Sequence, residues 1–328
     1  MNTKQKHQSQ SSKIFNCHST VQLEGFKNPS SQYKWSFILP NQAQLPFLDA
    51  IITPSDFPLR YDELIKLPSL KVISSYGTSY DYIDVKAASE LGILVTNTQN
   101  SPVRAVAELG ISLILASVRN IVRHDHLIRN KNCSGFANEV FKYPIISHNF
   151  SEQIVGIIGY GKVGKTIFDL IKKLRFKAYY YQPSGPVGGN SNYRDLPQLL
   201  ASSDVIVLCT SLNSKSYHLI NSISLRHIKQ GSKIVNISHG LCIDELSLIR
   251  ALKTNRISGA ALDVFEYEAR ISKELIEMDQ VILSPNAGDR TIEAKRAMTA
   301  EAVENIIQAL NKTPQNAINL DFWQRRDF

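Results

Sequence analysis

A glycine-rich turn between residues 154 and 164 has the residue types and the spacing to hold a phosphate group. The segment reads IVGIIGYGKVG, in which Gly159, Gly161 and Gly164 match G-x-G-x-x-G after an apolar run. The first glycine permits a tight turn, the second lets the backbone approach a pyrophosphate, and the third lets helix and strand pack closely. A helical pattern follows, and free N–H groups at a helix N-terminus favour anions. The segment predicts a dinucleotide-binding βα unit, with a ligand-free glycine turn as the alternative.

The residue expected to bind the ribose of that dinucleotide is an amide, Gln182, and not an acid. The dinucleotide pattern has Asp or Glu about 20 residues after its glycines. Here an apolar run at 178–181 ends at Gln182, and Pro183-Ser184-Gly185 follows without an arginine. Glutamine can hydrogen-bond a ribose hydroxyl, but it carries no charge to repel a 2′-phosphate. The choice between NAD and NADP therefore stays open, with NAD slightly favoured.

Two series of short apolar runs alternate with helical patterns and must position these residues. Strands that alternate with helices indicate parallel sheets with helices on their faces. Six strands in the second series are the full count of a doubly wound fold. The first series is predicted at 36–39, 50–53, 70–74 and 94–96, and the second at 154–158, 178–181, 205–208, 233–236, 259–263 and 281–283.

The chain is long enough for two domains, and a polar tail precedes them. Residues 1–33 are rich in Ser, Gln, Asn and Lys, lack the apolar core of a secretion signal, and are predicted to be disordered. Residues 34–103 together with 291–328 form the predicted substrate domain, and 104–290 the dinucleotide-binding domain. One long helix is expected from 103 to about 129, and an amphipathic helix from about 291 to 310 leads back to the first domain.

Composition and charge exclude several classes of function. The chain is 43% hydrophobic and 20% charged, as ordinary globular proteins are, and has no apolar run that could span a bilayer. Its net charge of +8 is spread over scattered Lys and Arg, which argues against a nucleic-acid partner and fits an anionic substrate and cofactor. The four cysteines show no paired spacing, so we expect no disulfide, no metal site and a cytoplasmic location.

Several segments in the right order resemble the D-isomer-specific 2-hydroxyacid dehydrogenase family, which includes phosphoglycerate dehydrogenase, glyoxylate reductase and C-terminal-binding protein. The resemblance runs from about residue 35 to 312. It implies a Rossmann cofactor domain inserted in a smaller flavodoxin-like α/β domain, hydride transfer between NAD(P) and C2 of a 2-oxo or 2-hydroxy acid, and a homodimer. The segments are SSYGTSYDYIDVKAASELGILVTNT at 74–98, AVAELGISLILA at 105–116, the glycine turn, 233–269 and VILSPNAG at 281–288.

The resemblance also places the family's three catalytic residues, of which two differ in type here. The arginine that clamps the substrate falls on His239, in Asn236-Ile-Ser-His-Gly. The glutamate that tunes the acid–base group falls on Glu268. The acid–base histidine falls on Asn286, an amide with no titratable proton near neutral pH. A neutral imidazole also lacks the permanent charge and forked donors of guanidinium.

Other site residues follow from the resemblance. The loop at Gly77, Thr78 and Ser79 matches the one whose backbone N–H groups hold the substrate carboxylate, and Asp263 matches the aspartate that receives the nicotinamide carboxamide. The remaining cofactor-binding candidates are Lys162, Val163, Thr210, Ser211, Ser216, Ile237 and Ser238.

Two functions remain open on the sequence. The first is an oxidoreductase of this family with an altered catalytic centre, in which His239 serves as a displaced acid–base group oriented by Glu268, since histidine titrates near neutral pH. The second is a dinucleotide-binding regulator or scaffold that keeps the fold without the chemistry. Binding of NADH or NADPH with no oxidation by any 2-oxo acid would distinguish the second from the first.

Overall fold

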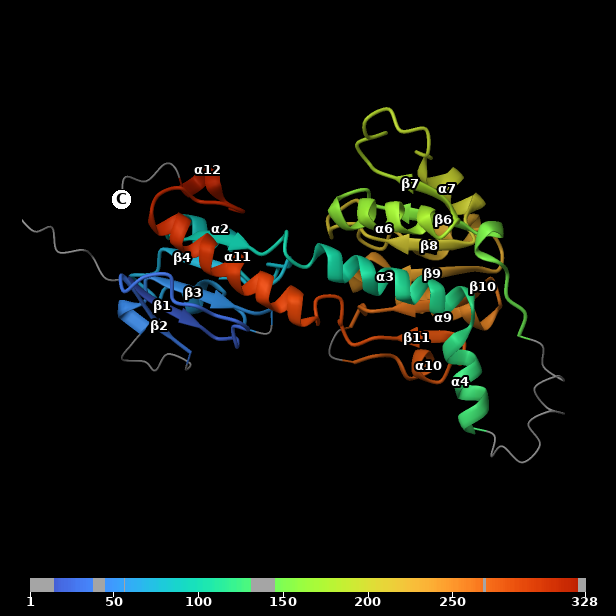
Figure 1. Ribbon diagram of the computed structural model, residues 1–328, viewed down its shortest axis with the longest axis horizontal. Helices are drawn as coiled ribbons and strands as arrows, with labels where there is room; N and C mark the ends of the chain where they lie inside the picture. Colours follow the sequence, from blue (N-terminus) through green and yellow to red (C-terminus); the bar gives the residue numbers. More distant parts are fainter. Residues whose placement is uncertain (1–14, 38–44, 56, 131–144, 268–269, 324–328) are drawn as a thin grey trace, which may run out of the picture. The chain divides into compact units, whose positions relative to one another are not determined.

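The computed structural model describes residues 15–37, 45–55, 57–130, 145–267 and 270–323. The chain divides into two compact units, with Met1–Pro102 and Thr291–Phe328 in unit 1 and Val103–Arg290 in unit 2. The sequence places the same two boundaries after residues 103 and 290, so the first differs by one residue and the second is identical. Each unit is built on its own sheet (Figure 1).

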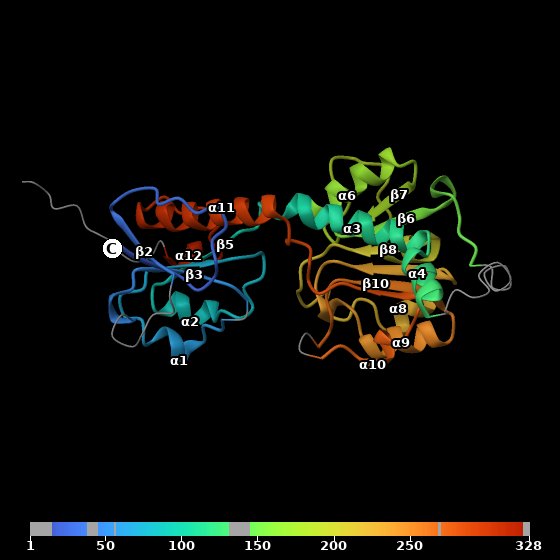
Figure 2. The same cartoon turned by 60° about the horizontal axis from the view of Figure 1, so that its bottom comes forward.

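Unit 1 is a five-stranded parallel sheet in the order β2-β1-β3-β4-β5, which is the order of flavodoxin-like sheets. Helices α1 and α2 cover one face, and α11 covers the other (Figure 2). Its elements are β1 (Phe15–Ser19), β2 (Tyr33–Ser36), the 3-10 turn η1 (Leu45–Phe47), β3 (Ala50–Thr53), α1 (Tyr61–Leu64), β4 (Val72–Ser75), α2 (Val85–Glu90), β5 (Leu94–Asn97), α11 (Ile292–Leu310) and α12 (Leu320–Trp323).

The prediction that residues 1–33 form a disordered tail is wrong for residues 15–33. Strand β1 lies inside the sheet, where it pairs with β2 on one side and β3 on the other. Its five residues, FNCHS, contain no apolar run, so the local pattern did not indicate a strand. Pairing on both edges and burial of Cys17 in the core beneath α11 stabilise it instead. The strand predicted at 36–39 is β2, which begins three residues earlier.

Unit 2 is a six-stranded parallel sheet in the order β11-β10-β9-β8-β6-β7, and a parallel bridge from Tyr180 to Tyr193 extends it beyond β7. Chain order therefore runs outward from β6 on one side and resumes at β8 on the other, as in a Rossmann fold. The predicted α/β fold with parallel sheets is confirmed. Its elements are α3 (Val103–Val118), α4 (Ile121–Asn130), η2 (Phe150–Glu152), β6 (Ile154–Ile158), α6 (Lys162–Lys173), β7 (Lys177–Tyr181), α7 (Leu196–Ser202), β8 (Val205–Leu208), α8 (Ser222–His227), β9 (Ser232–Asn236), η3 (Gly240–Cys242), α9 (Glu245–Lys253), β10 (Ile257–Leu262), α10 (Lys273–Ile276) and β11 (Val281–Leu283).

The strands of unit 2 are apolar throughout because helices cover both faces of the sheet. Along β8, Val205 and Val207 pack on the side of α3 and α6, while Ile206 and Leu208 pack on the side of α7, α8 and α9. Figure 2 shows these two helix layers on either side of the sheet. Burial on both faces accounts for the continuous apolar runs that the sequence shows.

The long helix predicted from 103 to 129 is two helices, α3 and α4, with a bend of 61° between them. Asn120 between them has a left-handed backbone (φ 51°), which ends an α-helix. Its side chain accepts from Lys233 Nζ at 3.0 Å and donates to Ser147 Oγ at 3.0 Å. The apolar pattern continues across this break, so it gave no sign of the bend. No single helix of the described residues is long and apolar enough to cross a membrane; α3 and α4 meet that test only as a bent pair.

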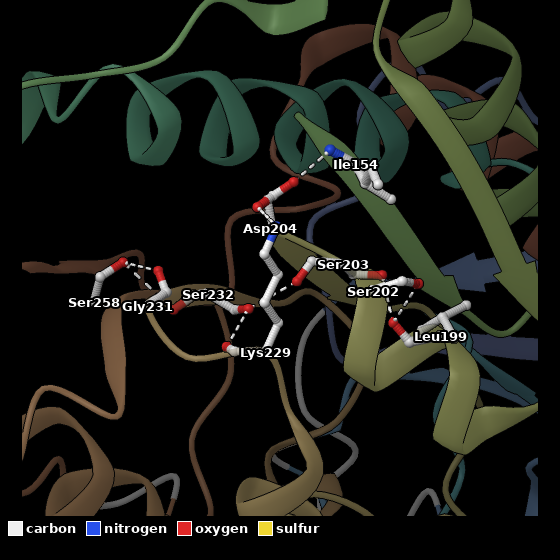
Figure 3. A network of polar contacts seen from close by, with 9 residues as sticks. All are labelled: Ile154, Leu199, Ser202, Ser203, Asp204, Lys229, Gly231, Ser232 and Ser258. Atoms are coloured by element: carbon white, nitrogen blue, oxygen red, sulfur yellow. Dashed lines mark hydrogen bonds and ion pairs between the residues drawn. The ribbon is translucent and has the colours of Figure 1, made fainter. Parts of the chain in front are cut away.

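A polar network at the amino edge of the unit 2 sheet is structural (Figure 3). Asp204 accepts from the N–H of Ile154 at 2.9 Å and pairs with Lys229 Nζ at 2.6 Å, so it joins the start of β6 to the loop before β9. Ser232 Oγ donates to the carbonyl of Ser203 at 2.7 Å. The candidate cofactor residues lie at the opposite, carboxyl edge.

Candidate functional site

The glycine turn follows β6 at the point where the strand order of unit 2 changes direction. Gly159 has φ 98°, and a Cβ there would lie 2.6 Å from the carbonyl oxygen of Cys209, just after β8. A Cβ on Gly164 would lie 2.0 Å from the carbonyl oxygen of Gly159. Both positions therefore require glycine, because the turn packs against β8 and α6 against the turn. In doubly wound sheets, ligands bind at this crossover, outside the carboxyl ends of the strands.

Gly161 is surrounded differently from the other two glycines. Its φ is −74°, and a Cβ added to it would meet no atom within 4 Å. It is the N-cap of α6, whose first turn includes Lys162 and Val163, and it contributes no side-chain cap. Open space beside an uncapped helix N-terminus suits a pyrophosphate, so these residues fit the dinucleotide that the sequence predicts.

Gln182 follows β7 and binds the glycine turn itself. Its side-chain Oε1 accepts from the backbone N–H of Tyr160 at 2.8 Å. Because an N–H donor requires the amide oxygen, this contact fixes the orientation of the amide and leaves its NH2 group as the donor. An acid at this position would offer a second acceptor, whereas Gln182 offers hydrogen-bond donors.

The loop after β8 is held by hydroxyl groups. Ser216, only 4% exposed, donates through Oγ to the carbonyl of Ser211 at 2.7 Å and accepts from the N–H of Asn213 at 2.8 Å. Thr210 and Ser211 are partly buried and exposed, respectively. Burial raises the pKa of the Cys209 thiol to about 12, so this cysteine stays a neutral thiol and is not a nucleophile.

The loop after β9 carries His239 and is shaped by Asn236, which is 1% exposed. The Oδ1 atom of Asn236 accepts from the backbone N–H of Ser238 at 3.0 Å, and its Nδ2 donates to the carbonyl of His239 at 3.0 Å. His239 is half-buried, and its Nδ1 accepts from the N–H of Leu241 at 3.3 Å. This contact needs an unprotonated Nδ1, which corresponds to the tautomer with its proton on Nε2. Ile237, 8% exposed, packs in the core.

Asp263, at the end of β10, positions the loop that contains Asn286. It is 2% exposed, and its two carboxylate oxygens accept from the N–H groups of Ala287 at 2.8 Å and Gly288 at 3.1 Å. Asn286 is exposed and has a left-handed backbone (φ 50°), and its N–H donates to the Asp263 carbonyl at 2.8 Å. The contact of Asp263 with a nicotinamide carboxamide stays a prediction.

A His–Glu pair that the sequence analysis missed joins these loops. His218 Nε2 lies 2.8 Å from Glu266 Oε1, and Glu266 Oε2 accepts from the N–H of Glu245 at 2.8 Å. The two partners are 48 positions apart in the chain, so no local pattern indicates the pair. Glu268 lies outside the described residues. Across the described ranges, no group of three or more His, Cys, Asp or Glu side chains could hold a metal ion.

The predicted substrate loop follows β4 in unit 1. Gly77 has φ 146° and donates its N–H to Thr98 Oγ1 at 2.8 Å, so the side chain of Thr98 already uses one of the three expected N–H groups. Thr78 and Ser79 are exposed, and their carbonyls accept from Asn97 Nδ2 at 2.8 Å and Ser75 Oγ at 2.7 Å. These contacts fix the loop while its outer residues remain accessible.

Comparison with known proteins agrees with this geometry. The sequence model of the D-isomer specific 2-hydroxyacid dehydrogenase NAD binding domain matches residues 111–288. The glyoxylate reductase of Thermococcus litoralis is 33% identical over 281 residues, which cover 84% of each chain. A glyoxylate reductase structure from Paecilomyes thermophila superposes with a TM-score of 0.79 at 23% identity, over 94% of this chain and 99% of that one.

A structure titled acyclic imino acid reductase, in complex with NADPH and D-Arg, superposes with a TM-score of 0.79 at 25% identity, over 93% of this chain and all of that one. The matched NAD-binding domain contains the glycine turn, Gln182, His239 and Asp263, so the cofactor class is NAD(P). This chain therefore belongs to the D-isomer-specific 2-hydroxyacid dehydrogenase family of oxidoreductases.

Proposed function

We propose that this protein is an NAD(P)H-dependent reductase of small 2-oxo acids. The observation that carries the proposal is the open space at Gly161, beside the uncapped N-terminus of α6 and at the crossover of the Rossmann sheet. The relative from Thermococcus litoralis is named a glyoxylate reductase, so glyoxylate is the first substrate to test.

Each part of the site has a separate task in this proposal. The N–H groups at the start of α6 hold the pyrophosphate, and the Gln182 amide binds the adenosine ribose. Bound NAD(P)H supplies the hydride that C2 of the substrate accepts. The loop at Thr78 and Ser79, which are both exposed, binds the substrate carboxylate through its backbone N–H groups. Asp263 holds the Asn286 loop in place through two backbone N–H groups.

Reduction of a carbonyl also needs a proton donor for the oxygen. Among the residues that the structure describes, we assign this role to His239. In the observed arrangement its Nδ1 accepts from Leu241, so the neutral ring can donate only a hydrogen bond from Nε2. To deliver a proton, Nδ1 must first take one up and release the Leu241 N–H. The Nε2 proton then passes to the carbonyl oxygen, which leaves a neutral ring with its proton on Nδ1. Exchange of protons with water restores the Nε2–H tautomer and the contact with the Leu241 N–H. Asn286 contributes a hydrogen bond only, since an amide cannot exchange a proton near neutral pH.

Asn286 favours a second candidate function, the reduction of 2-imino acids. A protonated imine already carries the proton that a carbonyl oxygen must acquire. Hydride addition to its carbon gives a neutral amine, which takes its last proton from water. A site with an amide in place of an acid–base group can support this reaction, and one structural neighbour at 25% identity is titled an acyclic imino acid reductase.

The experiment that separates the two candidates measures both products. The protein is incubated with NADH or NADPH and glyoxylate or a longer 2-oxo acid, with and without ammonium, and the hydroxy acid and amino acid are quantified by mass spectrometry. The carbonyl proposal expects hydroxy acid without ammonium. The imine candidate expects amino acid only when ammonium is present.

Asn286→His tests the chemistry of this position directly. We expect hydroxy acid formation to rise by about a hundredfold, because a positioned acid–base group contributes about that much. Histidine tolerates a left-handed backbone well. Asn255→His is the matched control, since Asn255 is exposed and has the same backbone conformation (φ 53°) at the end of α9.

His239→Asn tests the proton donor, and unchanged hydroxy acid formation in this variant would rule out His239 as that donor.

Binding of NADH, seen as enhanced cofactor fluorescence, with no product under any condition would favour the regulator or scaffold over both reductases.

A further inference from the structure

A contact between loops of unit 2 gives His218 a role in the proposed reaction. We infer that His218 positions His239 through the carboxylate of Glu266. The inference rests on the proposed function, because it assumes that His239 acts on the substrate. Four contacts carry it, and together they form a closed ring of residues that includes His239.

The first contact is the His218–Glu266 pair. The Glu266 side chain is 8% exposed, and each of its oxygens has a donor, His218 Nε2 at 2.8 Å and the N–H of Glu245 at 2.8 Å. A buried carboxylate needs such partners, because unpaired charge in a protein interior is strongly unfavourable. Removing the His218 imidazole leaves one carboxylate oxygen without its donor, and Glu266 must then move toward water.

The second contact transmits that movement to the residue beside His239. A Cβ on Gly240 would lie 1.7 Å from the carbonyl oxygen of Phe265 and 2.7 Å from the N atom of Glu266. The backbone at 265–266 thus packs directly on Gly240, with no side chain between them to absorb a shift. Displacement of Glu266 therefore displaces Gly240 and the adjacent His239.

The third and fourth contacts meet at Leu241. Its carbonyl accepts from the N–H of His218 at 2.8 Å, and its own N–H donates to His239 Nδ1 at 3.3 Å. The contact with Nδ1 selects the neutral imidazole form with the proton on Nε2. His218 therefore reaches His239 by two routes, through Glu266 and Gly240 and through Leu241.

The backbone of His218 supports this assignment. It has φ 45°, a left-handed conformation that few residues other than glycine adopt, although histidine tolerates it better than most, and Asn221 Nδ2 donates to its carbonyl at 2.8 Å. Such conformations persist where the surrounding contacts determine them, and they are common beside active sites. From this conformation the imidazole reaches Glu266.

The test reads the tautomer of His239 rather than activity alone. Imidazole ¹⁵N–¹H correlation spectra of the labelled full-length protein distinguish a protonated from an unprotonated Nδ1. We expect one unprotonated Nδ1 for His239 in the wild type. In His218→Asn the backbone conformation is favourable but the side chain is too short to reach Glu266, so we expect averaged nitrogen shifts for His239.

The same variant should separate turnover from cofactor binding. We expect kcat to fall about tenfold, because small misplacements of a reacting group cost that much or more. The KM for the cofactor should stay within about twofold, since no contact of Gly161 is altered. His218→Gln, which keeps a donor for Glu266, should restore part of kcat. The control is His227→Asn, an exposed histidine in the last turn of α8.

Glu266→Gln removes the charge without changing the shape, and it remains informative if His218→Asn does not fold. It should shift the His239 signals in the same direction. Unchanged His239 signals in either folded variant would overturn the inference. If the signals shift but His239→Asn leaves turnover intact, the positioning is real and the proposed role of His239 is wrong.

Discussion

The three glycines of the turn after β6 have different physical roles, although the sequence pattern treats them alike. Gly159 and Gly164 are needed for packing, because a Cβ on either would overlap a backbone carbonyl oxygen. Gly161 has open space instead, so its lack of a side chain benefits a ligand and not the fold. At the same scale, Gln182 binds the turn through its oxygen, and the group that remains for a ribose is a donor.

The orientation of Gln182 leads to a prediction about cofactor choice. Gln182→Glu keeps the shape and the acceptor for Tyr160, but it replaces the NH2 group with a negatively charged oxygen. We expect the ratio of kcat/KM for NADH to that for NADPH to rise by about fivefold, because one charge near a 2′-phosphate costs roughly 1 kcal/mol even at high dielectric. Steady-state kinetics with both cofactors measure the ratio.

Gln198→Glu, on the exposed side of α7, adds the same charge elsewhere and should leave the ratio unchanged. An unchanged ratio in Gln182→Glu as well would mean that this side chain does not face the ribose.

At the scale of elements, helix α9 anchors the loop that carries His239. Asp244 is its N-cap and accepts from the N–H of Ser247 at 3.2 Å and from its hydroxyl at 2.6 Å. The next residue, Glu245, donates its N–H to Glu266. The start of this helix therefore fixes both the loop after β9 and the loop after β10.

We expect Asp244→Ala to lower the free energy of unfolding by about 1 kcal/mol, the usual cost of losing an N-cap. Partial burial raises the pKa of Asp244, but the hydrogen bonds from Ser247 and the charges of His218 and Arg250 outweigh it, so the pKa is lowered. A lowered folded-state pKa means that this stabilisation is present above the usual pKa of Asp, about 4, and is lost as the pH falls through the lowered value.

Urea unfolding of the wild type and Asp244→Ala between neutral and acid pH measures this dependence. Asp244→Asn is the matched control, because it keeps a capping oxygen without the charge, and its difference from the wild type should vanish at low pH. A difference between wild type and Asp244→Ala that is constant over this range would contradict the electrostatic part of the prediction.

For the whole molecule, we propose that unit 2 mediates a homodimer. The proposal is supported by two exposed apolar residues near the break between α3 and α4. Ile121, at the start of α4, is 55% exposed, and Ile146, which precedes the Ser147 that contacts Asn120, is 78% exposed. Exposed apolar residues that gather on one surface are typical of protein interfaces.

We expect sedimentation to give twice the chain mass of 36.8 kDa for the wild type. Ile121→Asp should weaken the dimer about tenfold or more, because an unpaired charge would be buried at the contact. Ile223→Asp on α8, where Ile223 is 67% exposed, is the control and should leave the dimer intact. A wild type that sediments as a monomer would refute the proposal.

The sequence by itself determined the α/β class and the glycine turn, because both follow from short-range patterns. Strand β8 alternates between two cores and reads as a continuous apolar run. Gly159, Gly161 and Gly164 lie within six positions of one another, so their spacing is visible without a structure. The N-cap of α11, Thr291, also lies where the sequence placed the start of that helix.

Only the tertiary structure decided the features that depend on distant residues. Strand β1 is stabilised by pairing with β2 and β3, and the bend at Asn120 is accompanied by contacts with Ser147 and Lys233. The His218–Glu266 pair joins loops that follow different strands. Such contacts leave no periodic signal, because parallel strands bring their carboxyl ends together only after the chain has folded.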